Sequence, residues 1–305
     1  VQGSFGFFHH LSHSLKEGAG YLIVALAFWQ LRRIGEGRYA VLWFFPFLWY
    51  LYLSQATQVY SRYVLPMLPY LCMFAAATAA EWADWVRRYR FSWERPVWVL
   101  LCFLLIVPNV FKSLALDILL MRKDVRIEAK DWIESHIPPG SKIAVDHTFF
   151  GPPLENTRER LEEWLREVDR RGGPELPKKR LGFMLQNALH PGYELYYLRE
   201  SEDGGERSFF TMPAAPYDWP TLEKMRMDYL IVIYDDSRDF PFGLSSFYRE
   251  LEEKSERVAR FSPFRSEKWI RPVGPEGMTG APLYTSEILA RRTNGYTIDI
   301  YRVLK

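Results

Sequence analysis

Residues that could bind a phosphate group stand at the start of a long uncharged stretch. Arg62 precedes residues 63–80, a run without a charged side chain and close to the ~20 residues that cross a ~30 Å hydrocarbon core as a helix. A guanidinium that leaves water needs a partner, so we expect Arg62 at the membrane–water boundary or facing a polar cavity. Together with the hydroxyls of Tyr60 and Tyr63, Arg62 offers the cation and donors that suit a phosphate.

The first 17 residues add His9, His13 and Lys16 as candidates for the same site. His9 and His13 are four residues apart and would share one face of a helix. This pair could contact phosphate or a metal, or it could belong to an amphipathic helix whose aromatic neighbours lie at headgroup depth. No carboxylate or third ligand lies nearby at ligand spacing, so we predict no metal site. His10 lies in the same stretch and could also contribute.

The chain has two unlike parts, which sets the domain organisation. Residues 1–112 are aromatic and apolar, whereas residues 113–305 hold most of the charge. The mean hydropathy of -0.19 averages over both parts, and the net charge of +2 gives no case for a nucleic-acid partner. Because the chain begins with Val1 and lacks a signal-peptide pattern, we expect the C-terminal part of a longer or processed protein.

Four uncharged runs, at about 18–31, 39–60, 63–80 and 96–111, are predicted to be transmembrane helices. Arginines are frequent in the segments 32–38 and 81–95, but only Arg62 lies between the second and third runs. The positive-inside rule therefore places 32–38 and 81–95 in the cytoplasm. Residues 1–17 and 113–305 then lie outside, in a multi-pass protein of the cytoplasmic membrane. A soluble protein with long buried helices is the alternative.

Beyond residue 112, helical and strand patterns alternate, which predicts an extracytoplasmic α/β domain. The predicted helices are 114–136, 154–170 and 245–255, with a helical turn at 222–227, and the predicted strands are 142–146, 193–198, 228–234, 257–261 and 296–303. Residues 262–295 are rich in Pro and Gly and are predicted to be irregular.

Carboxylates follow two of these strands, at Asp146 and within 235–239, where α/β folds place their sites. For 235–239 we favour a solvated turn over a calcium site, because the ligand spacing is incomplete. The basic run 178–180 is expected to be solvated or to meet lipid headgroups.

Several segments resemble bacterial membrane glycosyltransferases of the GT-C class, in the family related to protein O-mannosyltransferases and lipid A aminoarabinose transferases. Residues 62–69, Arg-Tyr-Val-Leu-Pro-Met-Leu-Pro, look like that family's Arg-Tyr, two hydrophobic residues, Pro and second Pro on a late span. Residues 129–143, 228–234 and 297–303 look like parts of the extracytoplasmic domain of its bacterial members. The resemblance covers most of the chain, but its motifs are degenerate and say nothing about the sugar.

This resemblance implies a hexosyl- or pentosyltransferase of the cell envelope. It would take a polyprenyl-phosphate sugar as donor and work at the outer face of the cytoplasmic membrane on a glycan, lipid or protein acceptor. We assign no cofactor. The family's catalytic carboxylate lies in a first extracytoplasmic loop that nothing here matches, so no catalytic residue is assigned in this chain. Two other functions stay open: a non-catalytic membrane protein whose outer domain binds glycan or partners, and a lipid-linked sugar transporter.

Overall fold

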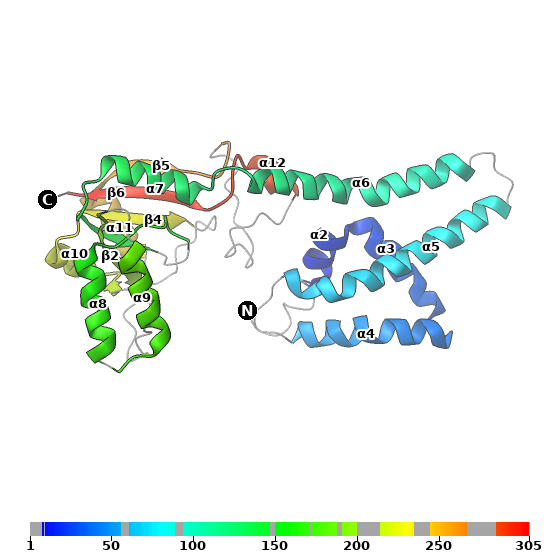
Figure 1. Cartoon of the computed structure of the whole chain (residues 1–305). Coiled ribbons are helices and arrows are strands. Elements are labelled where there is room, and N and C mark those ends of the chain that lie inside the picture. Colours follow the sequence, from blue (N-terminus) through cyan, green and yellow to red (C-terminus); the bar gives the residue numbers. More distant parts are fainter. Residues whose placement is uncertain are drawn as a thin grey trace. The chain divides into compact units, whose positions relative to one another are not determined.

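Helices and one mixed six-stranded sheet make up the computed structural model of this chain (Figure 1). It describes residues 8, 10–55, 61–88, 94–146, 150–170, 172–187, 191–199, 214–234, 245–266 and 285–304. The chain divides into a helical unit, Val1–Ile118 with Pro282–Leu289, and a sheet unit, Leu119–Ala281 with Ala290–Lys305.

The helical unit is built from short and long helices that follow the uncharged runs. These are the π-helix η1 (His10–Ser14), α2 (Leu15–Ala19), α3 (Tyr21–Trp29), the 3-10 helix η2 (Gln30–Arg33), α4 (Gly37–Ser54), the 3-10 helix η3 (Ser61–Met67), α5 (Leu68–Arg88) and α6 (Glu94–Leu120). Most of α12 (Thr285–Ala290) also belongs to this unit. The predicted span 18–31 is therefore not one helix. Gly20 interrupts it with a φ of +86°, a conformation that glycine adopts without steric cost.

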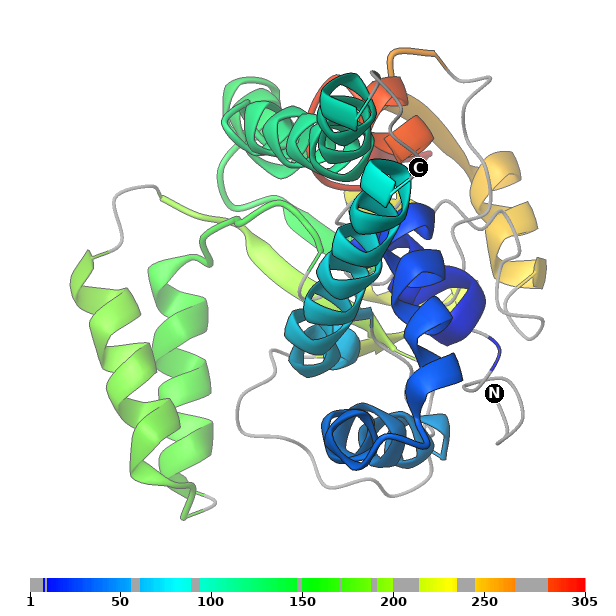
Figure 2. The same cartoon turned by 90° about the vertical axis from the view of Figure 1, so that its right-hand side faces the viewer.

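Helices α3 and α5 pack side by side through apolar and polar contacts (Figures 1 and 2). Thr78 is fully buried; its hydroxyl donates to the carbonyl of Leu26 at 2.8 Å and accepts from Gln30 Nε2 at 3.0 Å. Because buried polar groups are costly unless they are hydrogen-bonded, these contacts favour one register of the two helices. Trp43 of α4 stacks on Phe74 of α5 with ring centroids 4.3 Å apart.

Two helical segments, Tyr63–Arg88 and Trp98–His136, are long and apolar enough to cross a membrane by length and composition. In the most apolar stretch of the first segment 39% of the residues are buried, whereas in the second none is. A helix that is apolar on all sides and uncovered by protein is typical of one that contacts lipid or further helices. Among the described residues, no helix of the runs 18–31 and 39–60 meets this criterion, so four spans stay a prediction.

The sheet unit places six strands between two layers of helices. Its elements are α7 (Val125–His136), β1 (Lys142–Val145), α8 (Arg158–Arg170), α9 (Glu175–Asn187), β2 (Glu194–Arg199), β3 (Ala214–Pro216), α10 (Trp219–Met225), β4 (Tyr229–Tyr234), α11 (Ser245–Lys254), β5 (Ser255–Phe261) and β6 (Thr297–Val303). The predicted alternation of helices and strands is confirmed. The predicted helix 114–136 is wrong as one element, because α7 starts anew at Asp124, whose carboxylate accepts from the backbone N–H of Arg126 at 2.8 Å.

The strand order in the sheet is β3-β2-β1-β4-β6-β5. β3, β2, β1 and β4 are parallel, and β6 runs antiparallel between β4 and β5. The chain moves outward from β1 through β2 to β3 and then returns to β4 on the other side of β1. Such a reversal is a topological switch point, where open α/β sheets leave a crevice at the carboxyl ends of their strands.

Alternating side chains of the strands form two cores on opposite faces of the sheet. Ile143 and Val145 of β1 pack with α7, while Ala144 between them packs with α10 and α11. β4 divides in the same way, with Ile231 and Ile233 on the α7 face and Leu230 and Val232 on the other. This two-sided burial explains why residues 229–234 form an unbroken run of apolar and aromatic side chains that predicts a strand well.

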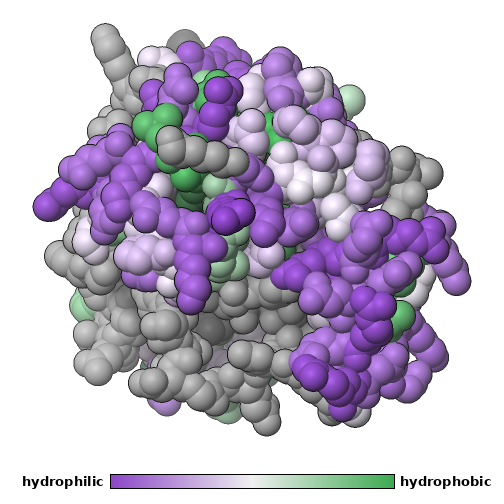
Figure 3. Space-filling view, turned by 90° about the vertical axis from the view of Figure 1, so that its left-hand side faces the viewer, coloured by the Kyte–Doolittle hydropathy of each residue, from purple (hydrophilic) through white to green (hydrophobic). Residues whose placement is uncertain are grey.

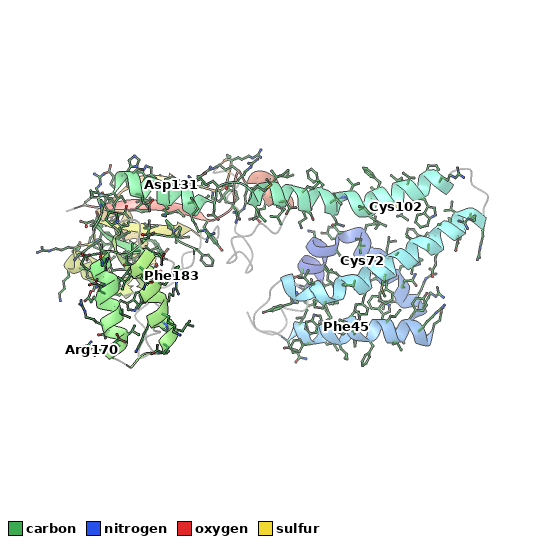
Figure 4. The ribbon with its side chains drawn as sticks, viewed as in Figure 1. Phe45, Cys72, Cys102, Asp131, Arg170 and Phe183 are labelled. Atoms are coloured by element: carbon green, nitrogen blue, oxygen red, sulfur yellow. The ribbon has the colours of Figure 1, made fainter. Side chains whose placement is uncertain are left out.

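A helical hairpin, α8 and α9, occupies the connection from β1 to β2. It has its own small core of Leu161, Val168 and Leu181 and stands away from the sheet, with Arg170 and Phe183 on its two helices (Figures 1 and 4). The sequence predicted α8, but α9 and β3 were missed. α12 also corrects the prediction that 262–295 is irregular. From the side of the sheet unit, the described surface is mostly hydrophilic (Figure 3).

Candidate functional site

The predicted phosphate-binding residues come from two segments that pack against each other. Leu15 of α2 and Val64 of η3 are each 1% exposed and belong to one core. A side chain at Gly18 would meet Leu68, at the start of α5, at 3.9 Å. The segment that contains Lys16 and the segment that contains Arg62 therefore lie together, although they are far apart in the sequence.

Two of these candidate residues have defined side-chain surroundings. Tyr63 is half-buried, and its backbone carbonyl accepts from Trp49 Nε1 at 2.8 Å, which ties η3 to α4. The Lys16 ammonium lies 4.8 Å from the centre of the Tyr21 ring, within cation–π range. These contacts fix the backbone on which the neighbouring candidates stand.

The remaining candidates are placed only in part. Arg62 lies in η3 and His13 in η1, each placed by its backbone alone. Tyr60 and His9 lie outside the described residues. The arrangement thus brings the backbones of η1, α2 and η3 to one place, at the N-terminal end of α5.

His10 has a structural role that the sequence did not indicate. It is fully buried, and its Nδ1 lies 3.0 Å from the Ser14 hydroxyl one π-helical turn later. This burial gives His10 a role in packing η1, and its contribution to a phosphate site stays a prediction. The signal available in the sequence was Ser14, four residues after His10.

The segments predicted to lie in the cytoplasm meet at a second polar cluster. Glu81 pairs with both Arg32 and Arg33, which joins the end of η2 to α5. Arg33 also binds Glu36 with Nε to Oε1 at 2.6 Å, and this hydrogen bond lowers the pKa of Glu36 to about 2. The two loops assigned to one membrane side by their charge therefore lie together.

Asp146 lies just after β1, at the topological switch point of the sheet. Its backbone N–H donates to the Ile231 carbonyl of β4 at 2.9 Å. Its carboxylate accepts from the Tyr217 hydroxyl and from the Tyr248 hydroxyl at 3.3 Å. Burial, and then the charge of Asp146, raise the pKa of Tyr248 far above its usual value.

This carboxylate therefore links β1 to the segment before α10 and to α11. Sequence reasoning found Asp146 but missed both tyrosines, because no local pattern marks residues that meet only in the folded sheet. No group of three or more His, Cys, Asp or Glu in the described part of the chain could hold a metal ion. The carboxylates of 235–239 lie outside that part.

Comparison with known proteins leaves the family open. No family model matches this chain, and no curated protein or solved structure matches it either. The resemblance to GT-C glycosyltransferases thus rests on the motifs in residues 62–69, 129–143, 228–234 and 297–303.

Proposed function

We propose that this chain is part of a membrane glycosyltransferase. It moves a hexosyl or pentosyl group from a polyprenyl-phosphate donor to an acceptor at the outer face of the cytoplasmic membrane. One observation carries the proposal: the segment of His13 and Lys16 packs against the segment of Arg62 and Tyr63 at the start of an apolar helix. Residues with cationic and hydroxyl groups on two neighbouring segments suit the phosphate of a lipid-linked sugar.

The proposed reaction breaks the bond between the sugar's anomeric carbon and the phosphate oxygen of the donor. An acceptor hydroxyl attacks the anomeric carbon and loses its proton to a general base, while polyprenyl phosphate leaves. Arg62 and Lys16 stabilise the negative charge that grows on the leaving phosphate. The base must lie about 2.6–3.2 Å from the acceptor proton's heavy atom, and in this proposal it comes from polypeptide outside these 305 residues, as the resemblance implies.

A second candidate is a non-catalytic membrane protein whose sheet unit binds glycan or a partner. The topological switch point between β1 and β4 favours it, because α/β folds bind ligands there. Purified chain, alone or co-expressed with the preceding part of the longer protein that we expect, would be supplied with polyprenyl-phosphate sugars, and release of lipid phosphate would be measured. Release only with the added part supports the enzyme. No release in either preparation, with glycan bound by the sheet unit, supports the second candidate.

We predict that position 35 lies in the cytoplasm and position 135 outside. A variant without Cys72 and Cys102, which lie on α5 and α6 (Figure 4), would carry a single cysteine as Gly35→Cys or Ser135→Cys. Both positions are exposed in the structure. A membrane-impermeant thiol reagent should label position 135 in intact cells and position 35 only after lysis. Labelling of position 35 in intact cells would contradict the proposed topology.

A further inference from the structure

A cleft of about 820 Å³ lies among η2, the end of α3, the C-terminal half of α5 and the start of α6. Four tryptophans line it, together with two arginines: Trp29, Trp82, Trp85, Trp98, Arg32 and Arg88. The remaining wall is formed by alanine, valine and leucine side chains of α5 and α6, together with the carboxylates of Glu81 and Asp84. Its size lies within the ~300–1,000 Å³ range of small-molecule sites.

The polar and apolar parts of this cleft match the two parts of a membrane lipid. Tryptophans concentrate where membrane helices pass from hydrocarbon to headgroups. Trp29 and Trp82 pack edge to face with ring centroids 6.1 Å apart, and the Arg32 guanidinium lies 5.1 Å from the Trp29 ring. Aromatic and cationic groups thus lie together at Trp29, Trp82 and Arg32, and aliphatic side chains of α5 and α6 also line the cleft.

Two of the described arginines near this cleft are held in ion pairs. Arg32 is neutralised by Glu81, and the neighbouring Arg87 by Asp84 at 3.6 Å. Arg88 is exposed and forms no ion pair or hydrogen bond among the described residues. An exposed guanidinium beside an apolar cleft is suited to one phosphate diester.

We propose that this cleft binds one glycerophospholipid, with its phosphate on Arg88, its headgroup region among the tryptophans and its acyl chains along α5 and α6. The inference rests on the proposed membrane location but not on sugar transfer. It also differs from the donor site. The donor site lies before α5, whereas Arg88 ends this helix of 21 residues, about 31 Å away at ~1.5 Å per residue.

The neighbouring arginines provide a matched pair of variants. Arg88 lines the cleft and Arg87 does not, although both are exposed residues at the end of α5. We expect Arg88→Gln to weaken binding of phosphatidylglycerol by about tenfold, the effect of losing one charge-assisted hydrogen bond. Arg87→Gln should change this affinity less than twofold. Native mass spectrometry of the intact chain in detergent, titrated with the lipid, measures both.

Two further ligands decide whether the phosphate and the lipid class matter. Diacylglycerol with the same acyl chains should bind at least tenfold more weakly than phosphatidylglycerol, and binding of equal strength would overturn the proposal. Undecaprenyl phosphate should not displace phosphatidylglycerol. If it did, and Arg88→Gln abolished this displacement, the cleft would be a donor site and the phospholipid proposal would be overturned. Equal loss of binding in Arg87→Gln and Arg88→Gln would show a general charge effect and also reject it. Sugar transfer, assayed separately, tests the proposed function independently.

Discussion

Gly192→Ala should destabilise the sheet unit by about 2–5 kcal/mol, the combined cost of a left-handed alanine and of overpacking. Gly192 has a φ of +80°, and a Cβ there would lie 2.3 Å from the backbone oxygen of Asn156 and 2.6 Å from the backbone nitrogen of Thr157. Backbone atoms cannot turn aside as a flexible side chain can. The substitution must therefore displace the segment before α8 or the start of β2.

Gly140→Ala is the matched control, because Gly140 also has a φ of +80° but nothing within 4 Å of the added Cβ. Its expected cost is about 1–2 kcal/mol, the conformational part alone. Hydrogen exchange of the intact chain, read by mass spectrometry on peptides from α7, β1 and β2, gives the local opening free energies. Equal losses in the two variants would show that the contact with Asn156 is relieved at little cost.

The expected loss should spread beyond the loop because Gly192 precedes a junction of the sheet unit. Its carbonyl accepts from the Gly140 N–H at 2.9 Å. The next residue, Tyr193, is fully buried, forms a bridge with Asn156 and donates its hydroxyl to the Ile133 carbonyl of α7 at 3.3 Å. The entry to β2, the start of β1 and the end of α7 therefore share one set of contacts. We expect the protected backbone amides in all three elements to exchange faster in Gly192→Ala.

Local pattern predicted the strands with two-sided burial and the helices with a clear apolar stripe. The run 228–234 becomes β4, and 154–170 contains α8, whose core residues Leu161 and Val168 share one face. α9 was missed because Pro177 and Gly182 fall inside it, and both residue types usually argue against a helix. Pro177 lies in its first turn, where a missing amide donor costs least.

Other features depended on contacts that the sequence does not display. The predicted run 18–31 is uncharged throughout, yet Gly20 breaks it, and Asn109 of α6 donates to the Ala19 carbonyl at this break at 3.2 Å. Likewise, residues 296–303 were predicted to be a strand, but the insertion of β6 between β4 and β5 comes from tertiary pairing. Period-two alternation identifies a strand but does not order it in a sheet.

For the candidate site, the sequence predicted residue types but not their surroundings. Arg62 stands out because it is the cation at the start of an uncharged run. The packing of Leu15 against the core that contains Val64 is what places the Lys16 segment beside it. His10 was predicted only as a residue that could contribute, and its full burial beside Ser14 could not be read from the sequence.

Arg62→Ala should reduce use of the lipid donor by about tenfold to a hundredfold in the active enzyme. A charge-assisted hydrogen bond contributes about 1.5–3 kcal/mol, which corresponds to that range in donor affinity. Arg62→Lys should recover part of the loss, because lysine keeps the positive charge but lacks the planar fork that binds phosphate through two hydrogen bonds. Donor KM and kcat, measured in membranes with equal amounts of each variant, give the comparison.

Arg38→Ala controls for the loss of a surface arginine in the same unit, since Arg38 is exposed and paired with Glu36 away from η3. Its donor KM and kcat should match those of the unaltered enzyme. Whether Arg62→Ala changes KM or kcat identifies the role of Arg62. A rise in KM alone means that Arg62 binds the donor and the transition state equally, whereas a fall in kcat means that Arg62 stabilises the leaving phosphate. If Arg62→Ala changed neither constant, Arg62 would be an interfacial anchor, and the packing of η3 against α2 would serve the stability of the helical unit.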